Sequence, residues 1–458
     1  MSGVTFIEEL KQNFSADNLV VQDIERKYLT DFVGSIVGKA DALVFASTAQ
    51  EVSKALKIAY AHDIPVTIRA AGTNLVASTI PEGGLVLDVS KMNRILNLDK
   101  ETYTVEVEPG VLLKDLQAYV EAQGLFYPPD PAEKEASIGG NLSTNAGGMR
   151  AVKYGVTRDY VRALEFVKAD GTIMNLGAVT CKFSSGLDLR ELVIGSEGSL
   201  GVITKAYLRL IPKPETSVSV VVAYSSLQTA IKSVNSLLNA CVNPTAIEFV
   251  EKRVIALGEK FLNQEFPYPE AQAYLILTFD GSAQSVETAL EISRDVLLDA
   301  GCIDFLPLTD PAVTKNVWEI RSALAKSVNA SGPWEPVDTI VPLNRIADFV
   351  AYTNEVSKEL NVRIIGFGHA GDGNVHLCII KDQIPDEKWP QVLDEALDKL
   401  YDKAYEFGGL TSAEHGIGKA KRKYFLKHTD PNVIALMQAV KQAFDPKGLL
   451  NIHDGYAK

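Results

Sequence analysis

The sequence is poor in cysteine and has no long apolar run. Its four cysteines, Cys181, Cys241, Cys302 and Cys378, are far apart and form no C-x-x-C pair, so neither an iron–sulfur cluster nor a disulfide framework is indicated. No segment reaches about 18 uninterrupted apolar residues, and we therefore expect no transmembrane helix. Residues 1–14 carry acids among apolar residues and no basic stretch, which argues against a signal or transit peptide and favours a cytoplasmic protein.

Several common catalytic motifs are also missing. The patterns G-x-x-x-x-G-K-[ST], H-E-x-x-H and G-x-S-x-G do not occur, so a P-loop NTPase, a thermolysin-like protease and an α/β-hydrolase are unsupported. Positive charge is in deficit, with 45 Lys and Arg against 58 Asp and Glu and a formal net charge of −13. This balance disfavours nucleic acid and anionic membrane surfaces as partners. A small anionic substrate would have to be bound by local positive charge.

The 458 residues are enough for two or three domains, and a mean hydropathy of +0.04 is typical of a globular protein. In the first half, short strand patterns at 43–45, 65–69, 85–89 and 103–108 alternate with helical patterns, which predicts an α+β fold with a βαβ opening. The Pro-punctuated stretch 211–214 marks a domain boundary. Beyond it, strands interrupted by single helices predict a mostly antiparallel sheet with helices on one face, a ferredoxin-like arrangement.

The stretch Gly366–Leu377 carries the clearest local signal of the second half. Apolar, β-branched residues flank the Asp-Gly pair at 372–373, which predicts a two-residue type I′ hairpin in which His369 faces His376. Alternation then puts His369, His376 and Asn374 on one face of the sheet. Two opposed imidazoles with β-carbons about 5 Å apart can reach one metal ion, so we interpret the hairpin as half of a metal site.

A second polar loop, Ser412–Gly418, follows a helical run and is bounded by glycine. It places Glu414 beside His415, which offers a third metal ligand and a general base. The other histidines of the chain, His62, His428 and His453, lie outside such loops, and we expect them to be structural.

Glycine-rich loops distinguish the first half of the chain. Residues 69–74 follow a strand and place Gly72 among small polar residues, so that backbone N–H groups can converge on an anion such as a pyrophosphate. Residues 137–148 combine Gly-Gly pairs with asparagines and suit neither helix nor strand, which indicates a backbone that approaches a ligand closely. Residues 195–201 repeat this chemistry ahead of a strand at 202–210.

These loops, with Pro128–Pro131 ahead of the second, resemble the FAD-contacting segments of vanillyl-alcohol oxidase type flavoproteins. Gly368–His376 with Glu414–Gly416 resembles the signature of the D-2-hydroxy acid dehydrogenases of that family, which include D-lactate dehydrogenases, glycolate oxidase flavin subunits and D-2-hydroxyglutarate dehydrogenases. The resemblance covers nearly the whole chain. It implies an FAD-binding domain over residues 1–213, a cap domain over 214–410, and a segment over 411–458 that returns to the FAD-binding domain and the active site.

The resemblance also implies the site residues. It places the metal on His369, His376 and Glu414, the proton acceptor on His415, and a contact to the substrate carboxylate on Arg321. A guanidinium suits that task because it binds a carboxylate through two parallel hydrogen bonds. Asn374, on the face of the histidines, would hydrogen-bond the substrate. FAD contacts are implied at Arg69, Ala71, Gly72, Thr73, Asn74, Pro129, Asp130, Ser137, Gly139, Gly140, Asn141, Ser143, Asn145, Gly147, Gly148, Glu197, Gly198, Gly201, Val202, Ile203 and Asn451.

The sequence therefore predicts an FAD- and metal-dependent dehydrogenase of small D-2-hydroxy acids, with D-lactate as the first candidate. Two histidines and one carboxylate suit Fe²⁺, Zn²⁺ or Mn²⁺. Residues 69–78 and 127–148 contain no His or Cys, so we expect FAD to be bound non-covalently. Without a cysteine cluster for an electron relay, the acceptor is expected to be a separate protein such as an electron-transferring flavoprotein.

Other functions stay open at this point. Glycolate or D-2-hydroxyglutarate could be the substrate, with electrons passed to quinone. A metal hydrolase could use His369, His376 and Glu414 with water as fourth ligand, and a colourless purified protein would favour it. A non-enzymatic flavin-binding or acidic interaction subunit would be favoured if no hydroxy acid bleached the flavin.

Overall fold

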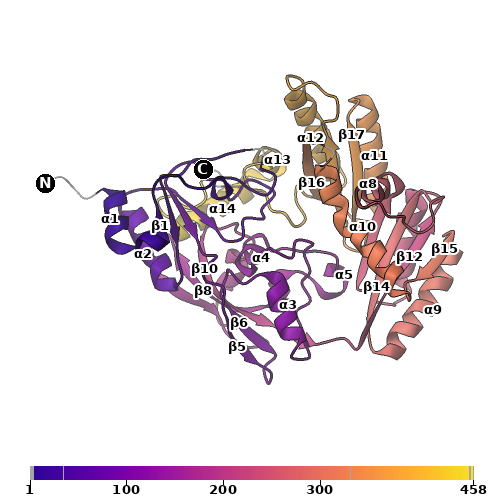
Figure 1. Ribbon diagram of the computed structural model, residues 1–458, viewed down its shortest axis with the longest axis horizontal. Coiled ribbons are helices and arrows are strands. Elements are labelled where there is room, and N and C mark those ends of the chain that lie inside the picture. Colours follow the sequence, from indigo (N-terminus) through magenta and orange to yellow (C-terminus); the bar gives the residue numbers. More distant parts are fainter. Residues whose placement is uncertain (1–4, 35, 331, 453–454, 457–458) are drawn as a thin grey trace. The chain divides into compact units, whose positions relative to one another are not determined.

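The computed structural model describes residues 5–34, 36–330, 332–452 and 455–456. The chain forms two compact units, whose elements are labelled in Figure 1. Unit 1 comprises Met1–Ala146, Val156–Lys213 and Glu414–Lys458, and unit 2 comprises Gly147–Gly155 and Pro214–Ala413. Unit 2 thus takes a short segment, 147–155, from within the first half of the chain.

The first sheet of unit 1 has the strand order β1-β2-β4-β3, made by Leu19–Val20, Ala42–Phe45, Leu85–Asp88 and Val66–Arg69. β2, β4 and β3 are parallel, which confirms the predicted βαβ opening. The crossover helix α2 (Ala49–Ala61) begins where the Thr48 side chain accepts a hydrogen bond from Glu51 N. α1 (Phe6–Asn13) packs against α2, and apolar residues of both helices form a core with the sheet.

The second sheet of unit 1 is antiparallel, with the order β5-β6-β10-β8-β9. Its strands are Ile95–Asp99, Thr104–Val107, Gly201–Arg209, Val161–Lys168 and Ile173–Gly177. β8 and β9 form a hairpin, with Gly171 at φ +79° in the turn. Because β10 begins at Gly201, the third glycine loop leads directly into this sheet.

Shorter elements complete unit 1. They are α3 (Leu113–Glu121), α4 (Ile138–Thr144), α6 (Leu189–Val193), α13 (Arg422–His428), α14 (Pro431–Phe444), the pair β7 (Leu125–Phe126) and β11 (Ile211–Pro212), and the 3₁₀ turns Ala16–Asn18, Arg26–Tyr28 and Thr157–Tyr160. α3 ends ahead of Gly124, which has φ +77°.

Unit 2 is built on a seven-stranded antiparallel sheet with the order β15-β12-β14-β13-β17-β18-β16. The strands in that order are Asp304–Pro307, Thr216–Tyr224, Ala273–Gly281, Ala246–Glu251, Arg363–His369, Asn374–Ile380 and Trp334–Ile340. Its helices are α5 (Ala151–Tyr154), α7 (Leu227–Asn239), α8 (Lys252–Leu262), α9 (Ala283–Asp299), α10 (Pro311–Asn329), α11 (Ile346–Glu359) and α12 (Trp389–Glu406), with a 3₁₀ turn at Leu343–Arg345. The predicted α+β class with an antiparallel cap sheet is confirmed.

The prediction that helices cover one face of this sheet was wrong. α8 and α10 share a core with one face of the central strands, for example through Val250 and Ile276. The alternate residues Leu275 and Leu277 are also fully buried, and α7, α9 and α11 pack on the sheet as well. Helices therefore cover both faces. The sequences of the central strands are continuous apolar runs because both faces of the sheet are buried.

The hairpin of β17 and β18 differs from the predicted one in its register. His369 pairs with Asn374 and Phe367 with His376, so four residues, Ala370–Gly373, form the loop. A type I′ turn needs positive φ at both central residues, and here Gly373 has φ +92° while the Asp372 side chain instead accepts a hydrogen bond from Asn374 N. The observed pairing is shifted by two residues from the predicted one, and side chains along a strand alternate between the two faces with a period of two residues. His369, His376 and Asn374 therefore still share one face, as predicted.

Candidate functional site

Polar side chains gather on one face of the unit 2 sheet, where β13, β17, β18 and β16 run side by side. The pairing of these strands puts Glu248, His369, Asn374, His376 and Asp338 on that face. All of them are buried, although the rest of the sheet is largely apolar. Buried polar groups need hydrogen-bond partners, and these residues provide them for one another.

Glu248 on β13 connects His369 to Arg321 on α10. Glu248 Oε1 lies 2.5 Å from His369 Nδ1, and Oε2 accepts hydrogen bonds from Arg321 Nε, at 3.1 Å, and from Nη2. Burial alone would raise the pKa of Glu248, but the positive charges of His369 and Arg321 outweigh it and lower this pKa to about 2. With a carboxylate at Nδ1, the Nε2 atom of His369 is the one that faces His376.

No motif in the sequence pointed to Glu248. The one available signal was an acid within the apolar strand pattern Ala246–Val250, at a position that alternation assigns to a buried face. Arg321, singled out for the substrate carboxylate, is buried and has two of its nitrogens held by Glu248. Among the described residues no partner is found for Arg321 Nη1. The role of Arg321 in substrate binding stays a prediction.

The two histidines turn their Nε2 atoms toward each other, 3.3 Å apart. His376 Nδ1 lies 3.8 Å from Asp338 Oδ1, so each imidazole has a carboxylate on its far side. Two nitrogen ligands about 2.1 Å from one tetrahedral ion are roughly 3.4 Å apart. The separation of His369 and His376 therefore fits a shared metal ion.

Asn374 has its amide nitrogen fully engaged. Nδ2 donates to Asp338 Oδ1 at 2.8 Å and to the carbonyl oxygen of Thr339 at 3.0 Å. An amide has two donors on nitrogen and acceptor capacity on oxygen, so only Oδ1 is left for a ligand. If Asn374 contacts the substrate, it does so as an acceptor.

The third proposed ligand, Glu414, and the proposed base, His415, open the C-terminal segment of unit 1. Both are partly buried, and His415 Nε2 lies 3.7 Å from Glu414 Oε1. The proposed ligands are thus divided between the two units, and the metal site stays a prediction. Of the histidines expected to be structural, His62 pairs with Glu9 at 2.7 Å, and His453 lies outside the described residues.

In unit 1 the glycine loops converge on Glu197. Its carboxylate accepts hydrogen bonds from Ser78 Oγ at 2.7 Å, Ile417 N at 2.8 Å and Gly418 N at 2.9 Å. Its own N–H donates to the carbonyl oxygen of Ser143 at 2.7 Å. Burial raises the pKa of Glu197, while these hydrogen bonds lower it less. Through its side chain and its backbone, Glu197 thereby joins Ser78, which follows the first loop, to α4 and to the segment after His415.

Asn451 makes a second connection within unit 1. Its Oδ1 accepts a hydrogen bond from Ile68 N at 3.0 Å, and its Nδ2 donates to the carbonyl oxygen of Glu197 at 2.6 Å. Gly198, at φ +73°, leaves room for it, because a β-carbon there would lie 3.0 Å from Asn451 Nδ2. The C-terminal segment thus holds β3 and the third loop together.

The prediction that the second loop suits neither helix nor strand was wrong, because Ile138–Thr144 form the helix α4. Ser137 accepts from Gly140 N at its start, and Asn145 has the left-handed conformation at its end. Gly139 packs on Pro109 so closely that a β-carbon would lie 2.6 Å from Pro109 Cβ. In the described part of the chain, the buried Asn141 Nδ2 has no hydrogen-bond partner. Such an unpaired donor fits a ligand rich in acceptor oxygens, as FAD is.

Some of the remaining predicted FAD residues are hydrogen-bonded to other protein groups, and the others are described by their position in the fold. Arg69 is buried and donates to the carbonyl oxygen of Thr30 at 2.8 Å, while Asn74 Oδ1 accepts from Val76 N and Ser78 N. Pro129 and Asp130 both accept from Gln117 Nε2 at 3.2 Å. Ala71, Gly72 and Thr73 belong to the first loop, Gly201, Val202 and Ile203 lie at the start of β10, and Gly147 and Gly148 belong to unit 2.

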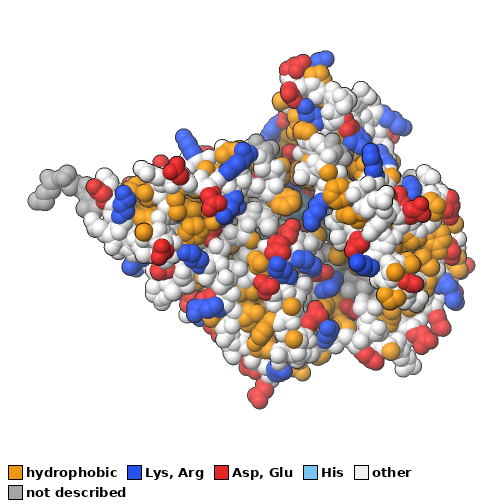
Figure 2. Space-filling view, viewed as in Figure 1, with side chains coloured by type: hydrophobic (Ala, Val, Ile, Leu, Met, Phe, Trp, Pro, Cys, Tyr) orange, Lys and Arg blue, Asp and Glu red, His pale blue; other side chains and the backbone are white. Residues whose placement is uncertain are grey.

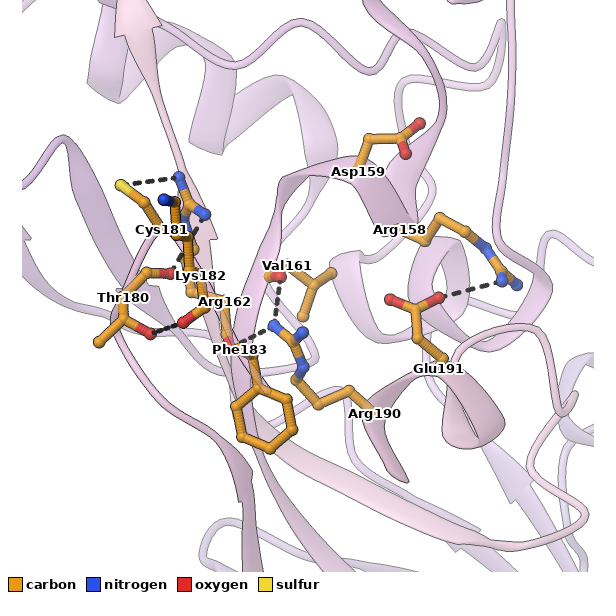
Figure 3. Close-up of a pocket in the computed structure, with 10 residues that line it drawn as sticks. All are labelled: Arg158, Asp159, Val161, Arg162, Thr180, Cys181, Lys182, Phe183, Arg190 and Glu191. Carbon is orange, nitrogen blue, oxygen red and sulfur yellow. Dashed lines mark hydrogen bonds and ion pairs between the residues drawn. The ribbon is translucent and has the colours of Figure 1, made fainter. Parts of the chain in front are cut away.

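A separate hollow of about 250 Å³ lies in unit 1 between the segments 158–162 and 180–191 (Figure 3). Its arginines have local partners: Arg158 binds Glu191, Arg162 binds the carbonyl oxygen of Thr180, and Arg190 binds that of Val161. Because these guanidinium groups are already engaged, we do not assign a ligand to this hollow.

Comparisons with known proteins agree with this picture. Residues 213–452 match the family described as FAD linked oxidases, C-terminal domain, and residues 40–177 match the FAD binding domain family. A D-lactate dehydrogenase of Anaerostipes hadrus is 42% identical over 97% of this chain and 96% of its own length. A glycolate oxidase subunit of Bacillus subtilis is 36% identical over 91% of this chain and 89% of its own.

Solved structures share the fold. p-Cresol methylhydroxylase with substrate bound superposes with a TM-score of 0.83 at 17% identity, covering 100% of this chain and 98% of that one. Alkyldihydroxyacetonephosphate synthase gives a TM-score of 0.75 at 18% identity, covering 97% and 85%. The fold and the converging glycine loops define a flavoprotein of the vanillyl-alcohol oxidase type. The chain belongs to the FAD-linked oxidase family and is an FAD-dependent oxidoreductase.

Proposed function

We propose that this protein oxidises D-lactate to pyruvate by hydride transfer to FAD, with a divalent metal on His369, His376 and Glu414. Its relatives named D-lactate dehydrogenase, in Anaerostipes hadrus and Archaeoglobus fulgidus, support the substrate class. The observation that carries the proposal is a buried row of side chains: Glu248, His369 and His376 on one sheet face, with Arg321 of α10 bound to Glu248. It combines a guanidinium for a carboxylate with two imidazoles for a metal.

Each side chain has a defined task in this proposal. Arg321 binds the substrate carboxylate through Nη1, and His415 takes the proton of the 2-hydroxyl. Asn374 Oδ1 can only accept, so it holds this hydroxyl by a hydrogen bond before the O–H turns to His415. Glu248 holds the guanidinium and the first imidazole in position. When bound, FAD supplies the hydride acceptor and the metal supplies a Lewis acid that lowers the pKa of the hydroxyl. FAD is held non-covalently.

Glycolate is the second candidate substrate. The relative in Bacillus subtilis that is 36% identical is named as a glycolate oxidase subunit. Glycolate carries the same carboxylate and 2-hydroxyl as lactate and lacks only the methyl group. The same protein groups would serve it, so the two substrates differ only in how they fill the pocket.

The test is anaerobic stopped-flow measurement of flavin bleaching with D-lactate, L-lactate, glycolate and D-2-hydroxyglutarate. D-Lactate is expected to bleach the flavin fastest. Protein stripped by a chelator, with metal and FAD contents measured, is expected to keep its FAD and bleach slowly. A flavin that none of these acids bleaches would rule out the proposed activity. Full speed in metal-free protein would rule out the role of the metal.

A further inference from the structure

Asp338 on β16 is fully buried and lies directly across from His376 on β18. Its Oδ1 accepts a hydrogen bond from Asn374 Nδ2 at 2.8 Å and lies 3.8 Å from His376 Nδ1. Its Oδ2 accepts from Ser412 Oγ at 2.7 Å and from Ala413 N at 3.2 Å. Ala413 is the residue that directly precedes Glu414 in the chain.

The chemistry of these contacts requires a carboxylate. The Nδ2 of Asn374 and the backbone N–H of Ala413 can only donate, and they approach opposite oxygens of Asp338. A carboxylate accepts on both oxygens, whereas an amide in its place would turn an NH₂ group toward one of these donors. Both oxygens of Asp338 are thus occupied by protein donors. The carboxylate lies 3.8 Å from Nδ1 of His376, too far for a hydrogen bond, but its negative charge favours a proton on Nδ1 and so leaves the lone pair on Nε2 for a metal.

We infer that Asp338 is a positioning residue of the metal site. It orients His376, holds the amide of Asn374 so that Oδ1 is presented to the substrate, and anchors the Ser412–Ala413 turn from which Glu414 extends. This inference rests on the proposed metal-dependent function. One buried carboxylate would thus hold Asn374 and Ala413 in place together, although they are 36 and 75 residues from it in the sequence.

The principal test is Asp338→Asn, which keeps the volume and removes one acceptor. Zn²⁺ affinity, measured by competition against a chromophoric chelator, is expected to fall by about 10- to 100-fold, as for other groups that orient metal ligands. FAD content is expected to match the wild type, and KM for D-lactate is expected to rise because Asn374 loses its partner. A Zn²⁺ affinity within twofold of the wild type would overturn the inference.

Two further variants keep the test decisive. Ser412→Ala removes one donor to Asp338 and should weaken Zn²⁺ binding by a few fold even if Asp338→Asn does not fold; unchanged binding in this variant would count against the inference. Glu259→Gln changes a carboxylate of unit 2 that accepts from Phe266 N, away from these groups, and should leave Zn²⁺ affinity unchanged. If wild-type protein binds no Zn²⁺, the proposed metal site fails. If the wild type and Asp338→Asn bind it equally, only the role of Asp338 fails.

Discussion

Arg321, Glu248 and His369 form a buried row of paired polar groups in the order guanidinium, carboxylate and imidazole. Burying charges is costly, and pairing compensates for that cost only when the contacts are well formed. Here the carboxylate is bonded on both sides, and the guanidinium lies over the Phe367 ring at 5.1 Å from its centre. Removing one member leaves the others buried without their partner. These three paired groups therefore affect the stability of unit 2.

The low pKa of Glu248 predicts a pH-dependent contribution to stability. Its pKa is lowered from 4.5 to about 2, so its stabilisation is present above pH 4.5 and is lost as pH falls toward 2. In metal-free protein, the unfolding free energy of the wild type should exceed that of Glu248→Gln by about 3 kcal/mol near neutral pH. Denaturant unfolding of both proteins at a series of acidic pH values should show this difference shrinking. A difference that does not change with pH would contradict the assignment.

At the scale of elements, the loop between β17 and β18 is supported by the short helix α5. Lys153 Nζ on α5 lies 2.5 Å from Asp280 Oδ1, and Tyr154 OH donates to the same oxygen at 2.9 Å. Val152, between these anchors and the loop, packs on Gly371, where a β-carbon would lie 2.7 Å from Val152 Cγ2. α5 therefore limits the position of the loop that separates His369 from Asn374.

This contact predicts a compensating pair of substitutions. Gly371→Ala should destabilise unit 2 by about 1–3 kcal/mol and weaken Zn²⁺ binding, because the added methyl group displaces the loop. Val152→Ala opens that space, so Gly371→Ala combined with Val152→Ala should recover most of both losses. Thermal unfolding and chelator competition on the single and double variants provide the measurement. Equal losses in the single and double variants would show that the contact does not place the loop.

At the scale of the whole molecule, the question is where the electrons of reduced FAD go. The cysteines are all free, two of them are exposed, and none is near another in sequence, so they offer no cluster for a relay. None of the described helices is both long and apolar enough to cross a membrane. Acidic, basic and hydrophobic side chains are interspersed over the face shown in Figure 2. We propose a separate redox protein as acceptor, with an electron-transferring flavoprotein as the first candidate.

The acceptor proposal predicts a clear order of turnover rates. With D-lactate as donor, oxygen alone or NAD⁺ alone should reoxidise the flavin slowly, and addition of an electron-transferring flavoprotein should raise turnover to a saturating rate. Steady-state assays with each acceptor, and with a quinone analogue as the alternative, provide the comparison. Rapid direct reduction of NAD⁺ by the isolated chain would exclude the proposal, and a quinone that outpaces the flavoprotein would replace it.

Local patterns predicted much of the fold. The βαβ opening follows from the alternation of strand and helix patterns along a short stretch, and a local cap at Thr48 begins its helix α2. The turn at 372–373 was mispredicted because an Asp-Gly pair is compatible both with a two-residue turn and with a longer loop. In the longer loop that forms, Asn374 N donates a hydrogen bond to the Asp372 side chain. Helices on both faces of the unit 2 sheet were missed because a fully apolar strand does not show which helix covers it.

The sequence by itself determined which side chains share a face. His369, Asn374 and His376 lie on one surface because strand alternation is a local property that survived a register change of two residues. Only the tertiary structure decided what surrounds them. Glu248 is 121 residues from His369 in the sequence. Glu248 and Asp338 lie beside the histidines because their strands, β13 and β16, flank the hairpin in the order β13-β17-β18-β16. That order depends on how the whole sheet packs between its two helical layers, and no short stretch of sequence encodes it.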